Sequence, residues 1–150
     1  MPFIAAAGVD LALPTGDSSR GFGEGAFVAA PYLAAGIGVA NLVQAQASAK
    51  LESPIAAGRT QTLVSALSTT LTLPSARQGL FPGLELVAET PLNGDPATLS
   101  LVPKLYAGLT KLGHVAVSVG AELPVVGDRS YDARVVAFFL WEYADGGIFW

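Results

Sequence analysis

The chain has 150 residues, of which 51% are hydrophobic and only 13% are charged, with a formal net charge of −4. A typical soluble domain has about 25% charged residues, so this chain has roughly half the usual solubilising charge. The acidic balance argues against a nucleic-acid partner, and the lack of cysteine excludes disulfides, thiolate catalysis and cysteine-based metal sites.

The length favours one domain covering residues 1–150. Its opening residues lack the positively charged start of a signal peptide, so an exported protein would have a targeting segment or further N-terminal strands outside this chain. The most apolar stretch, residues 26–43, is interrupted by Pro31, Gly36 and Gly38, which argues against a membrane-spanning helix.

Alternation of apolar and polar residues predicts β-strands along the whole chain. In residues 98–109, for example, Leu99, Leu101 and Leu105 share one face and Lys104 lies on the other. The lengths, about 10–13 residues for most strands, match the 9–11 residues that a tilted strand needs to cross a bilayer better than the usual 5–6. In chain order, the predicted strands are residues 3–14, 26–36, 40–51, 60–73, 82–90, 98–109, 114–125 and 131–143.

A motif of a carboxylate, one residue and a proline recurs at the ends of predicted strands. It occurs at residues 52–54, 89–91 and 122–124, with a looser copy at residues 10–14. A repeated strand-and-turn unit of this kind predicts an antiparallel up-and-down meander, which with eight long strands indicates an all-β transmembrane barrel, alone or as part of a larger barrel.

The predicted connections tend to alternate in length. Polar connections at residues 15–25, 52–59, 91–97 and 127–130 contrast with short turns at residues 36–38 and 111–113, and residues 74–83 form a long exception. Long loops on one side and short turns on the other are typical of outer-membrane barrels.

The charged residues predict which face of the sheet lines the interior. Folding the chain at residues 93–95 sets Glu85 across from Lys104, and folding it at residues 127–130 sets Glu122 near Arg134. A Lys or Arg facing lipid at mid-membrane costs about 2–4 kcal/mol, so the polar face is expected to line the lumen. The predicted lumen or binding residues are Asp10, Glu52, Glu85, Glu89, Lys104, Glu122 and Arg134.

Two interpretations of the rim carboxylates Glu52, Glu89 and Glu122 remain open at this stage. They could form a ring that attracts cations, with Asp10 as a fourth member, or they could pair with interior bases and cap the turns. The narrow interior of an eight-stranded barrel favours pairing.

No constellation for catalysis, metal binding or cofactor binding is visible, so we expect neither an enzyme nor a cofactor. His114 is the only histidine and is predicted to lie at a rim, and residues 21–25 form a glycine-rich segment that no helix follows. Aromatic residues near predicted strand ends could form interfacial girdles or pack inside. They are Phe3, Phe27, Phe81, Tyr131, Phe139, Trp141 and Tyr143.

The segments LVPKLYAGL (101–109), VAVSVGAELPVVGD (115–128) and RVVAFFLWEY (134–143) carry a family resemblance, as does GVDLALPTGD at residues 8–17. They resemble the strands of Gram-negative outer-membrane β-barrels, most of all the transporters grouped with the meta-pathway phenol-degradation family. The resemblance implies a location in the cell outer membrane, lipid and the barrel-assembly machinery as partners, and a small aromatic or hydrophobic compound as solute. The alternating aromatics from Phe139 to Tyr143 look like an assembly signal, although the chain continues to residue 150.

A second hypothesis is a soluble or periplasmic β-barrel that holds an apolar ligand. This fold would place the apolar face inward and the polar face in water. A third, a lipid-modifying enzyme on the same scaffold, lacks any visible catalytic group.

Overall fold

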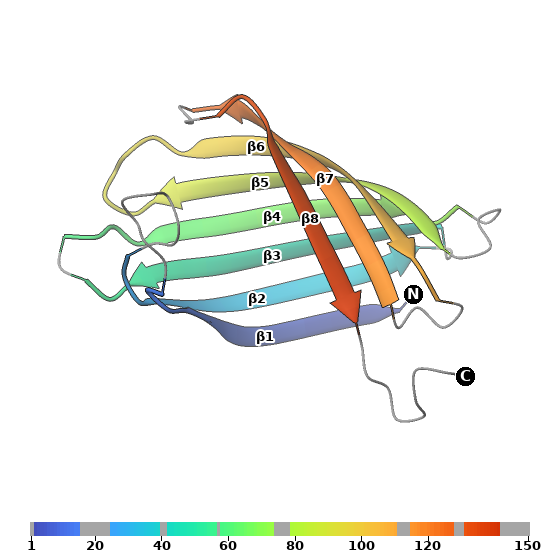
Figure 1. Cartoon of the computed structure of the whole chain (residues 1–150), viewed down its shortest axis with the longest axis horizontal. Helices are drawn as coiled ribbons and strands as arrows, with labels where there is room; N and C mark the ends of the chain where they lie inside the picture. Colours follow the sequence, from blue (N-terminus) through green and yellow to red (C-terminus); the bar gives the residue numbers. More distant parts are fainter. Residues whose placement is uncertain are drawn as a thin grey trace.

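The computed structural model describes residues 2–15, 25–39, 42–56, 58–73, 79–110, 115–127 and 131–141. Within them, eight antiparallel strands follow one another in chain order in a single sheet (Figure 1). The strands are β1 (Phe3–Ala12), β2 (Val28–Val39), β3 (Val43–Pro54), β4 (Thr62–Leu71), β5 (Leu80–Pro91), β6 (Thr98–Gly108), β7 (Val115–Val126) and β8 (Arg134–Trp141). The prediction of an all-β antiparallel meander is confirmed.

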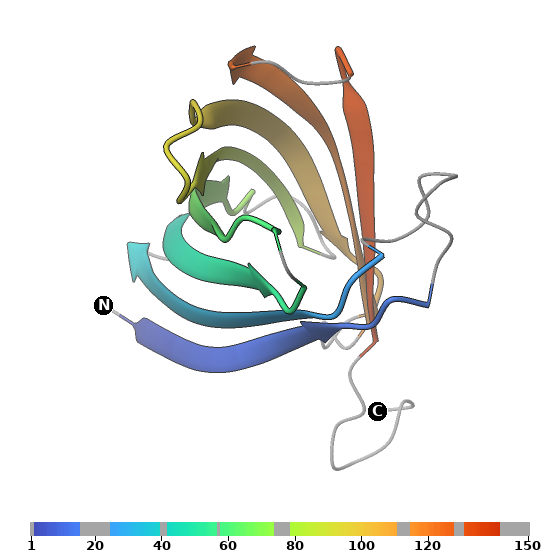
Figure 2. The ribbon, with the colours of Figure 1, turned by 90° about the vertical axis from the view of Figure 1, so that its left-hand side faces the viewer.

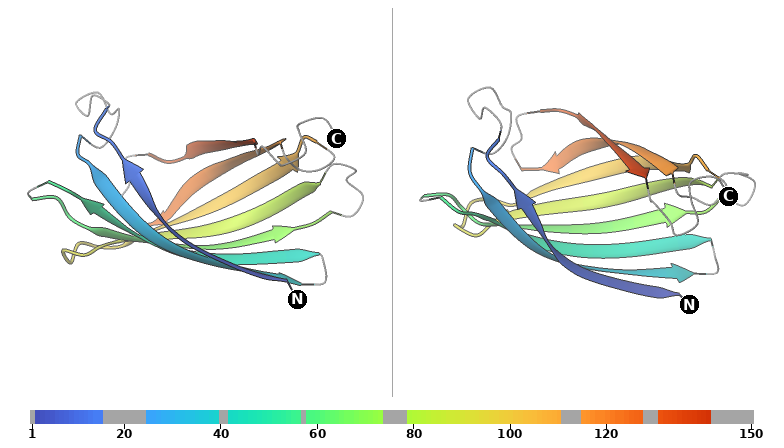
Figure 3. Two further views of the ribbon diagram at one scale, coloured as in Figure 1. Left: turned by 90° about the horizontal axis from the view of Figure 1, so that it is seen from below. Right: turned by 60° about the horizontal axis from the view of Figure 1, so that its bottom comes forward.

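The sheet is strongly curled and forms a half-barrel with one concave and one convex face (Figure 2). β1 pairs only with β2 and β8 only with β7, and β1 and β8 do not touch within the described part of the chain. The sheet therefore remains open between its first and last strands (Figure 3).

The strands are staggered, as the tilted strands of a barrel are. A row of paired residues on the concave face starts at Ile4, near the beginning of β1, and reaches Arg134 at the beginning of β8. Because β1 and β8 run in opposite directions, these two residues lie toward opposite rims of the sheet. In a closed barrel, such an offset of the register accompanies strand tilt. From end to end, the row is Ile4, Gly36, Gln46, Ser68, Glu85, Val102, Glu122 and Arg134.

The short turn predicted at residues 36–38 is wrong, because β2 continues through these residues to Val39. Gly36 pairs with Ile4 on one side and Gln46 on the other. A Cβ on Gly36 would lie 3.2 Å from Gln46 Cγ and 3.3 Å from Ile4 Cγ2. The glycine thus makes room for neighbouring side chains inside a strand.

The predicted turn around Gly94 is confirmed. The backbone N–H of Asp95 donates a hydrogen bond to Asn93 Oδ1 at 3.1 Å, and Gly94 has a φ of 92°, a conformation that favours glycine. The register beyond this turn differs from the predicted one by two residues, since Val102 rather than Lys104 lies opposite Glu85. The difference arises because the last residues of β5, through Pro91, pair with β4 alone.

The burial of apolar side chains in this sheet is opposite to that in a globular protein, where large apolar side chains are buried in a core. The buried apolar residues are small or medium-sized, and large apolar residues in the middle of strands are exposed, such as Leu33 (67%) and Leu67 (54%). No helix of the described residues is long and apolar enough to span a membrane. The buried apolar residues are Ala26, Val28, Ala30, Val102 and Ala116.

Candidate binding cavity on the concave face

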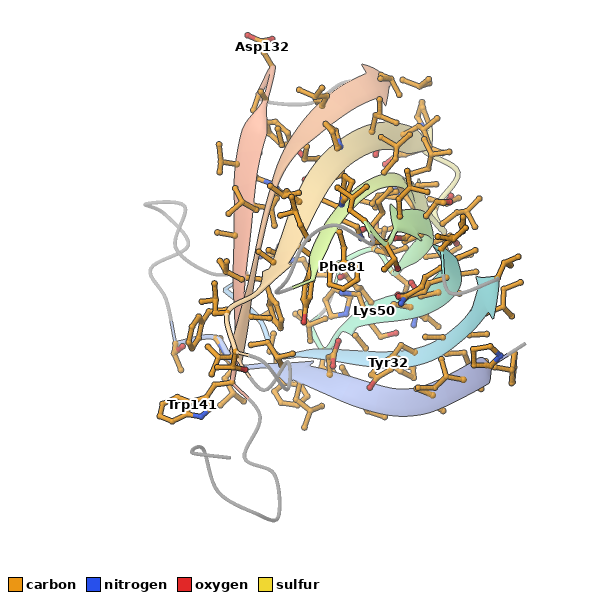
Figure 4. All side chains as sticks on the ribbon, turned by 90° about the vertical axis from the view of Figure 1, so that its right-hand side faces the viewer. Tyr32, Lys50, Phe81, Asp132 and Trp141 are labelled. Atoms are coloured by element: carbon orange, nitrogen blue, oxygen red, sulfur yellow. The ribbon has the colours of Figure 1, made fainter. Side chains whose placement is uncertain are left out.

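The polar side chains of the strands gather on the concave face. Figure 4 shows Tyr32, Lys50 and Phe81 inside the curl of the sheet, whereas Trp141 projects outside it. The facing predicted from the alternating pattern is therefore the one that the structure has, because Lys104 also lines the concave face.

An ion pair lies near the middle of this face. Lys104 Nζ donates to Glu85 Oε2 at 2.5 Å, and the side chains are 24% and 26% exposed. Lys104 lies between Gly83 on β5 and Gly120 on β7, its direct partners in the sheet. A Cβ on Gly120 would lie 3.2 Å from Lys104 Cβ, so the absence of a side chain there leaves space for the lysine.

A second, more buried ion pair joins β7 to β8. Glu122, whose side chain is only 5% exposed, pairs with the guanidinium of Arg134, and Arg134 Nε donates to Oε2 at 2.9 Å. The hydroxyl of Tyr131 donates to Oε1 of the same carboxylate at 2.9 Å. The Arg134 guanidinium also lies 5.2 Å from the centre of the Tyr131 ring. The predicted proximity of Glu122 and Arg134 is confirmed.

The four rim carboxylates lie on alternate strands, β1, β3, β5 and β7, toward the same rim. Glu52 pairs with Lys50 at 2.8 Å, as Glu122 pairs with Arg134, so each of these two carboxylates has a basic partner. Asp10 lines a small hollow together with Lys50, Glu52 and Arg59. The arrangement supports ion pairing over a free carboxylate ring for Glu52 and Glu122.

Glu89 occupies the corresponding position on β5. Its backbone lies opposite Val64 on β4 and Thr98 on β6. Ser100, two residues farther along β6, lies opposite Val87. The two-residue difference found for Glu85 thus applies along the whole β5–β6 pair.

A cavity of about 800 Å³ opens on the concave face toward the other rim. One side is polar, with Gln44, Gln46, Ser68 and Thr70 on β3 and β4. The Glu85–Lys104 pair lies in the lining next to this polar side. The cavity thus has hydrogen-bonding groups on one side. Next to them lies the Glu85–Lys104 pair, in which the two charges neutralise one another.

Another part of the lining is aromatic. Phe81 on β5 and Tyr106 on β6 contact one another with ring centres 5.6 Å apart and planes tilted by 59°. Phe138 and Val136 on β8 complete this wall. The combination suits a small molecule that has both an apolar part and a hydrogen-bonding group, because ligand sites typically combine apolar walls with a few polar groups.

Sequence reasoning missed this lining, since only Glu85 and Lys104 of the cavity were predicted as site residues. The alternation of side chains along β8 could have predicted the position of Phe138. This residue is an even number of residues from Arg134 and therefore shares its face. Phe81 shares a face with Glu85 in the same way.

The predicted aromatic girdle is only partly supported. Phe3, Phe139 and Trp141 are exposed by 69%, 60% and 60% and lie near one rim. Phe81 and Tyr131 instead face the cavity and Glu122. Phe27 is half-buried just before β2. His114, Tyr143, the first four residues (21–24) of the glycine-rich segment at 21–25, and the turn at residues 111–113 lie outside the described residues.

In the described ranges, no cluster of three or more histidines or carboxylates could hold a metal ion. Comparisons of the chain with protein-family models, curated proteins and solved structures each found no match.

Proposed function

We propose that this chain forms the wall of an outer-membrane β-barrel that binds or passes a small aromatic or hydrophobic compound. The observation that carries the proposal is the facing of the strands. Large apolar side chains project from the convex face in mid-strand, while the Lys104–Glu85 pair lies on the concave face.

The facing of the strands is more favourable in lipid than in water. Exposed apolar patches on soluble monomers rarely exceed about 300–600 Å², and a patch of leucines spread over several strands is unfavourable in water. In lipid the same surface has no such cost, and the inward position of Lys104 avoids the roughly 2–4 kcal/mol of a lipid-facing lysine. Among the convex residues are Leu33, Leu67, Leu86, Leu105 and Val119.

The cavity supports the choice of solute. Phe81, Tyr106 and Phe138 line a space of about 800 Å³, a size that accommodates a small organic molecule. The polar side chains that line the cavity on β3 and β4 would hydrogen-bond to a hydroxyl or carbonyl group of that molecule and so orient it. Trp141 and Phe139, exposed on the last described strand, would serve as the aromatic residues that barrel-assembly machinery engages.

The alternative of a soluble carrier requires apolar residues around the interior and polar residues outside. The exposed fractions of Leu67 and Leu33 weigh against it, as does the presence of Lys104 inside the curl.

The proposal is tested by refolding the chain in detergent and measuring whether its mobility in a denaturing gel changes on heating, which is typical of folded membrane barrels. Insertion into lipid vesicles is measured in parallel, followed by conductance across planar bilayers. Folded, inserted protein that produces no conductance events would restrict the function to binding. A folded monomer that stays in solution without detergent would contradict the proposal.

A further inference from the structure

The cavity on the concave face contains one cation and one anion. Of the described residues that line it, only Glu85 and Lys104 have charged side chains. The other polar side chains of this lining are amides and hydroxyls, such as Gln46 and Ser68, which donate and accept hydrogen bonds without a charge. The carboxylate beside Lys104 therefore determines whether the cation is available to a ligand.

We propose that Glu85 makes this cavity selective for uncharged aromatic molecules, because it occupies the ammonium group that would otherwise bind an anionic one. The inference rests on the proposed function, since it concerns the ligand of the same cavity. Lys104 Nζ donates to Glu85 Oε2 at 2.5 Å, and both side chains are mostly buried. An anion placed against this pair loses hydration, and the repulsion of the carboxylate offsets the attraction of the ammonium group.

The backbone of neighbouring glycines keeps the lysine at the cavity wall. A Cβ on Gly83 would lie 3.4 Å from Lys104 Cε, and a Cβ on Gly120 would lie 3.2 Å from Lys104 Cβ. The aliphatic part of the lysine side chain thus lies close to both glycines. This packing does not involve Glu85, so the ammonium group stays beside the cavity when the carboxylate is removed.

Neither of the neighbouring carboxylates is placed to take over from Glu85. Glu122 is already bonded to Arg134, whose Nε donates to it at 2.9 Å. Glu89 is four residues beyond Glu85 on β5, which is about 13 Å in the direction away from Lys104. Removal of the charge of Glu85 therefore leaves the ammonium group to an anionic ligand.

The rest of the lining suits a ring with one uncharged polar group. Phe81 and Tyr106 supply aromatic contacts, and Gln46 and Ser68 supply hydrogen-bond partners for a hydroxyl, a carbonyl or an amide. The expected ligands are aromatic alcohols, ketones and amides. Aromatic carboxylates and amines, which are charged at neutral pH, are expected to bind weakly.

The test uses three probes that share a naphthalene ring: 2-naphthol, the anion 2-naphthoate and the cation 2-naphthylmethylammonium. Binding to the protein refolded in detergent is measured by equilibrium dialysis at neutral pH. The unchanged protein should bind 2-naphthol at least about 10-fold more tightly than either ion. Glu85→Gln should raise the affinity for 2-naphthoate about 10-fold, and Lys104→Gln should do the same for 2-naphthylmethylammonium. The affinity for 2-naphthol should change less than about three-fold in both variants.

Matched controls remove the same charges elsewhere. Asp132→Asn alters a residue before β8 that projects away from the curl of the sheet (Figure 4). Lys50→Gln alters a lysine that pairs with Glu52 and lies outside the described lining of the cavity. Both should leave the three affinities unchanged. Partition of the probes into detergent is the same for every variant, so a difference between variants reports the protein.

Heat-modifiable mobility in a gel shows that each variant has folded before its binding is measured. Folded Glu85→Gln protein with an unchanged affinity for 2-naphthoate would overturn the proposal. If that variant does not fold, the response of Lys104→Gln to the cation decides in the same way, and if neither folds, the preference of the unchanged protein decides. An unchanged protein that binds 2-naphthoate as tightly as 2-naphthol would also overturn the proposal.

These results are distinguishable from failure of the proposed function. Folded protein that binds 2-naphthol but shows no dependence on Glu85 would retain the binding function and reject the role of this residue. Folded protein that binds none of the three probes would reject the binding function and the inference together.

Discussion

Lys104 and Glu85 form an ion pair at 2.5 Å although they are not opposite one another in the sheet. Glycine is the direct partner of Lys104 on both sides, Gly83 on β5 and Gly120 on β7. The lysine side chain therefore reaches diagonally to Glu85 across space that the glycines leave open. Diagonal neighbours are within reach of long side chains, and the pair occupies the centre of the concave face.

Removing one member of this pair should destabilise the folded protein more than removing both. Lys104→Met leaves the Glu85 carboxylate without its partner in a partly buried position, and we expect a loss of about 1–3 kcal/mol in the free energy of unfolding. Glu85→Gln combined with Lys104→Met should recover part of that loss. Urea unfolding in lipid vesicles measures both. Lys50→Met is the control, because its pair with Glu52 is more exposed and should contribute less than about 1 kcal/mol.

Gly120→Val should disturb the concave face, whereas Ala121→Val on the other face should not. A Cβ at Gly120 would meet Pro103 O at 3.0 Å and Lys104 Cβ at 3.2 Å, and the two further methyl groups of valine deepen that clash. Overpacking of this kind costs about 1–3 kcal/mol. The unfolding midpoint in urea is the measurement, and equal midpoints for the two variants would contradict the placement of Gly120.

A charge on the convex face tests the membrane environment directly. Leu67→Lys in the middle of β4 should reduce the free energy of folding into lipid vesicles by about 2–4 kcal/mol. Leu92→Lys, in the connection after β5, is similarly exposed in the starting protein (54% each) and should have little effect. If both substitutions were equally harmless, the convex face would be facing water.

Neighbouring phenylalanines on β8 separate the two faces in a binding assay. Phe138 lines the cavity and Phe139 projects from the opposite face, although both are more than half exposed. With 2-naphthol as a fluorescent probe, Phe138→Ala should weaken binding about 5- to 10-fold, since an aromatic contact contributes about 0.5–1.5 kcal/mol beyond burial. Phe139→Ala should leave the affinity unchanged. Equal losses in the two variants would place the probe outside the cavity.

The alternation of residue types along the chain determined much of the fold. Because side chains alternate strictly between the faces of a strand, the positions of Lys104, Glu122 and Arg134 were sufficient to predict which face is concave. The pair between Glu122 and Arg134 could be predicted because their strands are adjacent in sequence. The pair between Glu85 and Lys104 was also correct, even with the register displaced by two residues, because a displacement of two preserves the face.

Other features required the tertiary structure. Gly36 has the sequence signature of a turn, yet it lies within β2 because side chains of β1 and β3 occupy the space beside it. The cavity is lined by both Gln46 of β3 and Phe138 of β8, residues that share one cavity only because the whole sheet is curled. Alternation is a local property that specifies the face of each side chain, whereas curl and stagger accumulate over many strand pairs. The openness between β1 and β8 was therefore decided by the assembled sheet and by no single segment of the chain.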